Sequence, residues 1–535
     1  MIHLSKKQLL WLIAVEVIAS LLFLHYALTS PAVFQSRFGV VCYIAFYFFI
    51  IALVGVAFSL AIIKKIPLHK VFLFLGFCFG VLSCLINTPG SIPDEPMHAS
   101  NIYLWSNRLM LLKESGMEQE NPVYIDIRSV ERLADNQVAP DYLGTATTID
   151  SYRQILRNTN WFYSKSDNQL VHATLRDHSV SPVVYLPAIF GFTIARLLSF
   201  GYYPMLMLGR LMMLAFYVFA ASWSIKKIPV GKMALFITAL LPMSIHLAAS
   251  LSYDAVILSL AMMLFATIVY LAYGDLKRVG TKEWLMTLAL SVLLAPCKVG
   301  VYLPIILLLL MVPSEKLGGK RKFVVFFTSI VAASIISCVL MNLNAISIGT
   351  NNAQVQHDSR HLVYSAQWVL HHPTDAFQMM LNTTRERYFS WMDGAVGSYL
   401  SWFTIKLDSW IITGFEVCLL LTAMKTDDAP SIAPAPLQRL LLLVPVVLCN
   451  FIFLFGMLLW WTPIGAPLID GIQGRYFIPM IPLILFAIPQ ISITLHLKRG
   501  ERIFPWKNFS SCLTMACVLL SCASLLNQVS VILSR

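Results

Sequence analysis

Long runs of apolar residues, separated by short polar segments, dominate the pattern along the chain. A helix needs roughly 20 residues to cross a bilayer, so each run of about this length predicts a membrane span. The pattern predicts an all-α polytopic membrane protein with about thirteen spans. They lie at residues 9–28, 39–63, 70–88, 204–224, 231–249, 254–273, 284–297, 300–313, 322–344, 408–424, 439–461, 476–496 and 510–532.

Two long stretches interrupt this pattern. Residues 89–181 hold twelve of the 27 acidic residues, which is typical of a solvated loop. Residues 346–406 mix polar and apolar positions, as helices on a membrane surface do. Residues 183–198 are apolar enough to span, but a span there would reverse the side of every later loop. We therefore interpret them as a helix along the membrane interface.

The runs at 284–297 and 300–313 are short, and Pro296, Lys298 and Gly300 separate them. We expect two short helices that meet near one membrane face. The segment 426–438 is polar and rich in proline, which is typical of a linker. The chain then divides into spans of unclear role (1–65), a main module (66–425), the linker and C-terminal spans (439–535).

Composition excludes several classes of protein. Of the 535 residues, 58% are hydrophobic and only 12% are charged, and the mean hydropathy is +0.72. Soluble domains are nearer half apolar and a quarter charged. A soluble enzyme, a disordered protein and a nucleic-acid binder are therefore excluded.

The distribution of lysine and arginine predicts the orientation in the membrane, because cytoplasmic loops are enriched in them. With the N-terminus in the cytoplasm, the loops predicted inside hold clusters of basic residues, and both long loops lie outside. The expected location is the plasma membrane. The inner clusters include Lys64, Lys65 and Lys70, then Lys226, Lys227 and Lys232, then Lys277, Arg278 and Lys282, then Lys316, Lys320, Arg321 and Lys322.

The first candidate for chemistry is Asp94 and Glu95, with His98 nearby, after the third span. Pro96 suits the first position of a helix and disfavours helical geometry at Glu95. One interpretation is that the carboxylates cap this helix. The other is that they act as a general base on a hydroxyl group, or hold a divalent metal ion together with His98.

Three further positions lie close to the same membrane face. Asp254, after Tyr253, either caps the helix that it begins or faces the same cavity as Asp94. Arg475 either grips a phosphate or extends toward lipid headgroups. Lys298, between the two short helices, is placed to reach the cavity. His246 is interpreted as a packed core histidine.

These short motifs, in this order, resemble a family of bacterial multi-pass membrane proteins grouped with the GT-C glycosyltransferases. The resemblance covers about residues 70–490. The GT-C plan has one span before the acidic motif, whereas three precede it here, so it assigns no role to residues 1–65. The matching residues are Pro93 to His98; Ser181, Pro182, Tyr185 and Pro187; Pro242, Met243, Ser252, Tyr253 and Asp254; Lys298, Tyr302 and Pro304; and Gln473 to Phe477 with Pro479.

The resemblance implies an enzyme that moves a sugar, with inversion, from a polyprenyl-phosphate donor to a cell-envelope glycan or lipid on the outer face. Asp94, with Glu95 beside it, would be the catalytic carboxylate, and such base catalysis is worth about 10²–10⁴ in rate. Arg475 and Lys298 would hold the donor phosphate. The acceptor or a divalent metal ion would be held by His98, Tyr253 and Asp254.

Two other functions use the same lipid carrier. A flippase or transporter of lipid-linked sugars needs a similar phosphate site, but transporters usually place their charges near the midplane between two related halves. A glycan polymerase transfers a whole chain instead of one sugar. Only the family resemblance distinguishes it from the single-sugar transferase.

Overall fold

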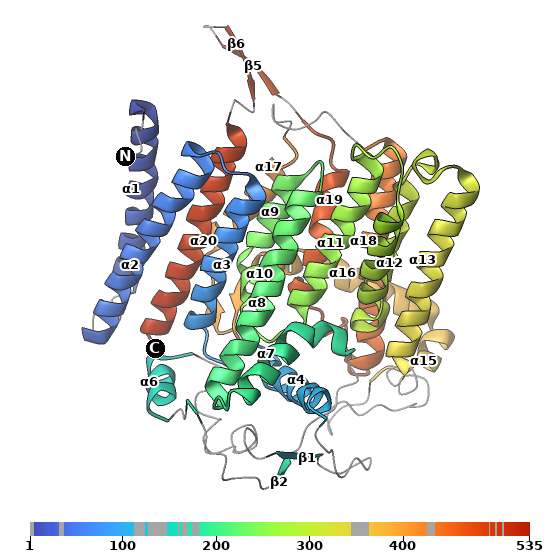
Figure 1. Ribbon diagram of the computed structural model, residues 1–535, viewed down its shortest axis with the longest axis horizontal. Helices are drawn as coiled ribbons and strands as arrows, with labels where there is room; N and C mark the ends of the chain where they lie inside the picture. The colour runs from blue at the N-terminus through green and yellow to red at the C-terminus, as the bar shows by residue number, and fades with distance from the viewer. Residues whose placement is uncertain are drawn as a thin grey trace.

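A bundle of long helices forms the body of the protein in a computed structural model, with the two termini at opposite ends (Figure 1). The structure describes residues 5–30, 37–111, 123–126, 147–158, 161–162, 170–173, 181–343, 363–424, 434–491, 493–497, 500–504 and 508–535. Most of the loop 89–181 and of the linker 426–438 therefore lies outside the described residues.

Among the described residues, eight helices are long and apolar enough to cross a membrane. Each corresponds to a predicted span, so the all-α multi-pass architecture is confirmed. They are α1 (Lys6–Thr29), α2 (Arg37–Phe58, continued by a π-helical turn at Ser59–Ile63), α3 (Leu68–Ile86), α8 (Tyr202–Lys227), α11 (Asp254–Tyr273), α13 (Lys320–Met341), α18 (Pro436–Trp460) and α20 (Phe509–Leu533).

The other five predicted spans contain shorter elements, so the count of thirteen stays a prediction. They hold α9 (Lys232–Leu240) and α10 (Pro242–Ala248), α12 (Thr281–Leu294), the 3-10 helix η5 (Leu303–Met311), α17 (Ser409–Leu421), and the 3-10 helix η7 (Gly474–Met480) with α19 (Ile481–Ala487).

Proline explains two of these differences. The expected helix 231–249 breaks at Leu241, whose backbone is extended (φ −51°, ψ 139°) because Pro242 follows it. The expected span 476–496 ends as a helix at Ala487, two residues before Pro489. The antiparallel strands β5 (Ile493–Leu497) and β6 (Gly500–Phe504) follow it.

The remaining elements lie mainly at the end of the bundle where the chain ends. In Figure 1, α4 (Glu95–Leu109) and α7 (Leu186–Leu197) lie across this lower end, as expected for an interfacial helix at 183–198. The others are α6 (Ile149–Asn158), α15 (Ala366–His371), α16 (Pro373–Val396), 3-10 turns at Pro182–Tyr185, Cys297–Gly300 and Ser314–Leu317, and the strand pairs β1 (Val123–Asp126) with β2 (Leu170–Ala173) and β3 (Tyr399–Leu400) with β4 (Ile405–Lys406).

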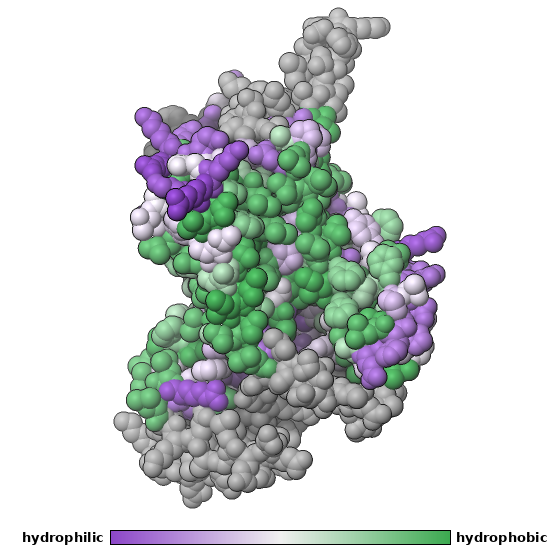
Figure 2. Space-filling view, turned by 90° about the vertical axis from the view of Figure 1, so that its right-hand side faces the viewer, coloured by the Kyte–Doolittle hydropathy of each residue, from purple (hydrophilic) through white to green (hydrophobic). Residues whose placement is uncertain are grey.

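Burial separates the centre of the bundle from its surface. Of the eight long helices, α11 is the most enclosed: 89% of its apolar 18-residue stretch is buried inside the protein. In α1 and α13 only 17% of the corresponding stretch is buried. Apolar side chains cover the middle of the face shown in Figure 2, with hydrophilic residues toward its two ends. An apolar belt of this kind suits contact with lipid tails. The helical backbone suits it too, because a helix satisfies its own backbone hydrogen bonds.

The basic clusters share one end of the bundle. Lys64 and Lys65 precede α3, Lys226 and Lys227 end α8, and Lys277 precedes α12. These connections lie at the upper end in Figure 1, opposite α4 and α7. The predicted grouping of basic loops on one side is therefore present.

Candidate functional site

Four charged side chains that lie far apart in the sequence meet at the lower end of the bundle. Lys298 Nζ lies 2.7 Å from Asp254 Oδ1, and Arg475 Nε lies 3.2 Å from Asp254 Oδ2. Arg475 Nη2 lies 3.6 Å from Asp94 Oδ2. The structure thus brings together the predicted base Asp94, the predicted phosphate ligands Lys298 and Arg475, and Asp254, which was predicted to hold the acceptor or a metal ion.

Asp94 takes an unusual backbone conformation at the start of α4. Its φ of 62° is left-handed, and its side chain makes no capping hydrogen bond. The capping interpretation is therefore wrong for Asp94. The helix begins at Glu95 rather than at Pro96, so the non-helical residue before it is Asp94 and not Glu95 as expected. The side chain of Asp94 is 45% exposed, which leaves it accessible to a ligand.

Asp254 has the opposite environment. It begins α11, and its side chain is only 8% exposed. Both of its carboxylate oxygens face cations, Lys298 on one side and Arg475 on the other. This geometry favours the second interpretation, in which Asp254 faces the same site as Asp94. Asp254 holds the two cations in place, whereas Asp94 keeps a loose contact with one of them.

A left-handed turn presents Lys298 to Asp254. Lys298 and Val299 have φ values of 47° and 54°, and Gly300 continues the turn at 86°. A β-branched residue such as Val299 rarely adopts this conformation, and such backbone strain gathers at functional sites. The turn separates α12 from η5, so the two short helices meet at Lys298 as the sequence predicts.

Both cations keep unused hydrogen-bonding capacity. Lys298 Nζ and Arg475 Nε lie within ion-pair distance of Asp254 but make no hydrogen bond of good geometry among the described residues. Lys298 Nζ also lies 3.4 Å from the centre of the Tyr476 ring. Burial lowers the pKa of the Lys298 ammonium to about 8, although Asp254 acts in the opposite direction.

Close packing of Gly474 positions Arg475. A Cβ at Gly474 would collide with the backbone of α16, at the carbonyl oxygen of Trp391 and at Gly394 and Ala395. Only glycine allows η7 to lie this close to α16. The ring of Trp391 also stacks on Phe477, at 5.1 Å between centroids. The Gln-Gly-Arg-Tyr-Phe motif is thus fixed from both sides of the arginine.

Glu95 points away from this cluster. Its carboxylate accepts hydrogen bonds from Arg210 Nε (2.7 Å) and Nη2 (2.5 Å), and from the backbone N–H groups of Gly90 and Leu251. Both charged side chains are buried, at 2% and 0% exposure. A carboxylate with these partners cannot readily take a proton from a ligand. The arrangement therefore favours a structural role for Glu95 over the catalytic role predicted beside Asp94.

His98 and Tyr253 pack against each other beside Asp254. His98 Nδ1 lies 2.8 Å from the hydroxyl of Tyr185, and the ring of Tyr253 packs on His98 at 4.9 Å. Among the described residues, no three His, Cys, Asp or Glu side chains gather closely enough to hold a metal ion. The predicted donor set does not converge, so the geometry favours packing roles for His98 and Tyr253 over metal binding.

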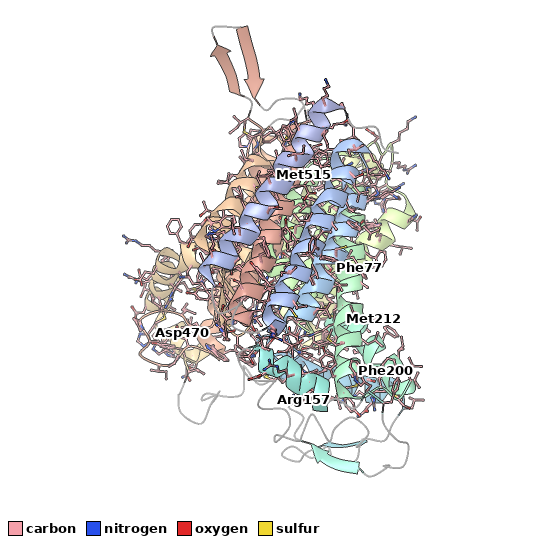
Figure 3. All side chains as sticks on the ribbon, turned by 90° about the vertical axis from the view of Figure 1, so that its left-hand side faces the viewer. Phe77, Arg157, Phe200, Met212, Asp470 and Met515 are labelled. Atoms are coloured by element: carbon pink, nitrogen blue, oxygen red, sulfur yellow. The ribbon has the colours of Figure 1, made fainter. Side chains whose placement is uncertain are left out.

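Two cavities border the charged cluster. The first, of about 340 Å³, is lined by Arg475, Pro93 and residues 387–403 and 469–474. The second, of about 460 Å³, is mostly apolar, and Lys298 and Tyr476 are among its lining residues. Asp470, which lines the first cavity, lies near the lower end of the bundle in Figure 3, far from Met515 of α20.

Several contacts escape sequence reasoning. The Tyr302 hydroxyl donates to the Tyr476 carbonyl at 3.0 Å, and Ser401 and Trp402 donate to the carbonyls of Ser91 and Gly90. Tyr302 belongs to the same short motif as Lys298, and this motif is the feature of the sequence that could have indicated its place near the site. Ser401 and Trp402 offer none, because a loop contact across some 310 positions leaves no local pattern.

Comparisons with known proteins place the chain in a family without adding a characterised relative. No curated protein and no solved structure gives a significant match. One family model, described as a predicted membrane protein family (DUF2142), matches residues 77–484, which is most of the chain. The matched region contains the whole charged cluster and both cavities. The chain therefore belongs to the DUF2142 family of predicted membrane proteins.

Proposed function

We propose that the protein is a GT-C type glycosyltransferase that moves a sugar from a polyprenyl-phosphate donor to a cell-envelope acceptor. The observation that supports this most is that two neighbouring cations line two different cavities, Lys298 a mostly apolar one and Arg475 a more polar one. A polyprenyl-phosphate sugar has the matching order of parts: an apolar chain, an anionic phosphate and a polar sugar.

The lipid would lie in the second cavity. Its walls include Val184, Ile257, Val301, Ile452, Phe453 and Trp460. These side chains suit an isoprenoid chain, because apolar contact is worth about 0.8 kcal/mol for each buried CH₂ group. Lys298 and Arg475, which keep free donors, would then pair with the phosphate at its end.

Asp94 would act as the general base. The acceptor oxygen attacks the anomeric carbon from the face opposite the phosphate, and the carbon–oxygen bond to the phosphate breaks. Both electrons of that bond leave with the phosphate oxygen, and the hydroxyl proton passes to the Asp94 carboxylate. The configuration at the anomeric carbon is inverted. The cations stabilise the charge that develops on the departing phosphate.

The orientation belongs to the same proposal. The basic loops at the far end of the bundle favour the cytoplasm for that end, by the positive-inside rule. The charged cluster then lies at the outer face of the plasma membrane, where the acceptor is a glycan or a lipid of the cell envelope.

The first experiment compares cells that carry Asp94→Asn with cells that carry Asp375→Asn, an exposed carboxylate on α16. Protein levels are matched, and the composition and linkages of the surface glycans are measured. We expect one sugar substituent to disappear only with Asp94→Asn, while the backbone polymer persists, because the base is worth about 10²–10⁴ in rate.

Two other outcomes would contradict the proposal. Loss of the whole polymer with Asp94→Asn would favour a polymerase or a flippase for lipid-linked glycans. Unchanged glycans would show that Asp94 is not the base.

A further inference from the structure

His246 lines the more polar cavity and keeps one ring nitrogen without a partner in the described part of the chain. Its side chain is 2% exposed, and its Nδ1 has no hydrogen-bond partner among the described residues. The residue belongs to α10 and lines the cavity together with Arg475 and Pro93, the neighbour of Asp94. A buried polar atom without a partner is costly, so this nitrogen calls for an explanation.

The other ring nitrogen determines where the proton is. The backbone N–H of Ser401 donates to Nε2 of His246 at 3.1 Å. A nitrogen that accepts a hydrogen bond carries no proton, so the neutral ring carries its proton on Nδ1. His246 therefore offers one N–H donor at the cavity wall.

The rest of the cavity wall suits a ligand rich in hydroxyl groups. Ser398 and Gln473 supply groups that both donate and accept, Trp391 supplies an aromatic surface, and Asp470 and Arg387 supply charge. A few polar groups in a concave, mostly apolar lining are typical of a small-molecule site. Lys298, by contrast, lines only the apolar cavity.

We propose that this cavity is the acceptor subsite, and that His246 Nδ1–H donates a hydrogen bond to an oxygen of a carbohydrate acceptor. This inference rests on the proposed function and specifies it: the acceptor is a glycan rather than a lipid. The bound glycan presents its reacting hydroxyl to Asp94, with the donor phosphate on the other side of Arg475. His246 would be a specificity-determining residue that touches the acceptor.

Two substitutions separate the two nitrogens of His246. His246→Gln places an amide near Nε2, so it keeps an acceptor for Ser401 and removes the donor at Nδ1. His246→Asn places an amide near Nδ1, so it keeps the donor and loses the bond to Ser401. The second variant controls for effects on folding that have nothing to do with the cavity.

The test uses the full chain in lipid nanodiscs and a cysteine at the cavity, Ser390→Cys. A charged maleimide labels this cysteine, and soluble fragments of the host's surface glycan are added as the probe. The chain with only its ten native cysteines gives the background. Binding of undecaprenyl phosphate, measured separately by native mass spectrometry, reports on the donor side.

We expect the glycan fragments to protect the cysteine, and His246→Gln to raise the half-protecting concentration about tenfold, as loss of one hydrogen bond predicts. His246→Asn should stay near the unsubstituted protein, and all three should bind undecaprenyl phosphate equally. Absence of protection, or equal protection in both variants, would overturn the acceptor subsite while the donor site stands. Failure of undecaprenyl phosphate to bind the unsubstituted chain would instead overturn the proposed function.

Discussion

The balance of charge at the site depends on Asp254. Lys298 and Arg475 bring two positive charges into a buried position, and Asp254 together with Asp94 offsets them. Ionised groups beside the apolar part of a membrane are costly unless they are paired. Asp254 therefore allows both cations to be held ready before a ligand arrives, and the phosphate of the proposed donor would add to pairs that already exist.

The pKa of Lys298 gives a prediction for this pairing. Its pKa of about 8 means that the ammonium is charged at pH 7 and loses its proton as the pH rises through 8. A phosphate monoester keeps its charge over this range, because its second pKa is about 6. The dissociation constant for undecaprenyl phosphate should therefore rise about tenfold between pH 7 and pH 9.5, as one charge-assisted contact is lost.

Titration of binding by native mass spectrometry or by a filter assay checks this expectation. The matched control is Lys298→Arg, which stays charged throughout and should show a flat profile. If the dissociation constant rises equally steeply with pH in that variant, the pH dependence belongs to another group.

At the scale of elements, the site depends on close contacts between segments that are not regular membrane helices. The 3-10 helix η7 carries Arg475 and lies against α16 because Gly474 has no side chain. The left-handed turn at Lys298 separates the two short helices α12 and η5. The left-handed Asp94 directly precedes α4. Rigid long helices surround these irregular pieces and hold them in place.

Gly474→Ala tests the contact between η7 and α16. The added methyl group would meet backbone atoms on α16, which cannot move aside as a flexible side chain can. Overpacking of this kind costs about 1–3 kcal/mol, and we expect the upper part of that range. Gly456→Ala is the control, because a Cβ there meets nothing within 4 Å.

Thermal unfolding of the two purified variants in the same detergent gives the comparison. We expect a lower midpoint for Gly474→Ala, and a midpoint for Gly456→Ala at or above that of the unsubstituted chain. Equal midpoints for the two would show that η7 is not held by this contact.

At the scale of the whole molecule, two parts of the chain can be distinguished. Residues 77–484 match the family, whereas α1, α2 and α20 lie outside that match. These three helices pack together along one edge, at the left of Figure 1. The Tyr26 hydroxyl of α1 donates to Asp408 beside α17, at 2.8 Å, which ties this layer to the rest.

The proposed orientation predicts which residues a reagent reaches from outside the cell. Asp375 lies exposed on α16, which packs on η7 at the end that holds the charged cluster, and Lys277 lies exposed in a basic loop at the other end. A membrane-impermeant maleimide should label Asp375→Cys in intact spheroplasts and should label Lys277→Cys only after the membrane is opened. The reverse pattern would place the charged cluster in the cytoplasm.

Much of this architecture is predictable from sequence because apolar length is a local property. The eight long helices agree with predicted spans to within a few residues, since each boundary is marked by polar residues or proline. Short motifs near one membrane face also suggest a common site for Asp94, Lys298 and Arg475, whereas for Asp254 the sequence leaves open a helix cap or the same site, and the contacts favour the second.

Other features depend on contacts that no local pattern encodes. The pairing of Glu95 with Arg210 joins positions 115 residues apart, and it removes Glu95 from the cluster despite its place beside Asp94. His246 was interpreted as a core histidine, and it is buried. Its Nε2 accepts from the distant backbone of Ser401, which leaves the proton on Nδ1, a nitrogen with no partner among the residues described.

Consecutive residues, Arg475 and Tyr476, line different cavities. In the proposed enzyme each substrate would have its own cavity, the lipid donor the mostly apolar one and the glycan the more polar one. Neither substrate would then need to leave before the other binds, so both orders of binding would lead to the same ternary complex. The products separate in the same way, since the spent carrier diffuses away within the membrane while the extended glycan leaves into the aqueous phase.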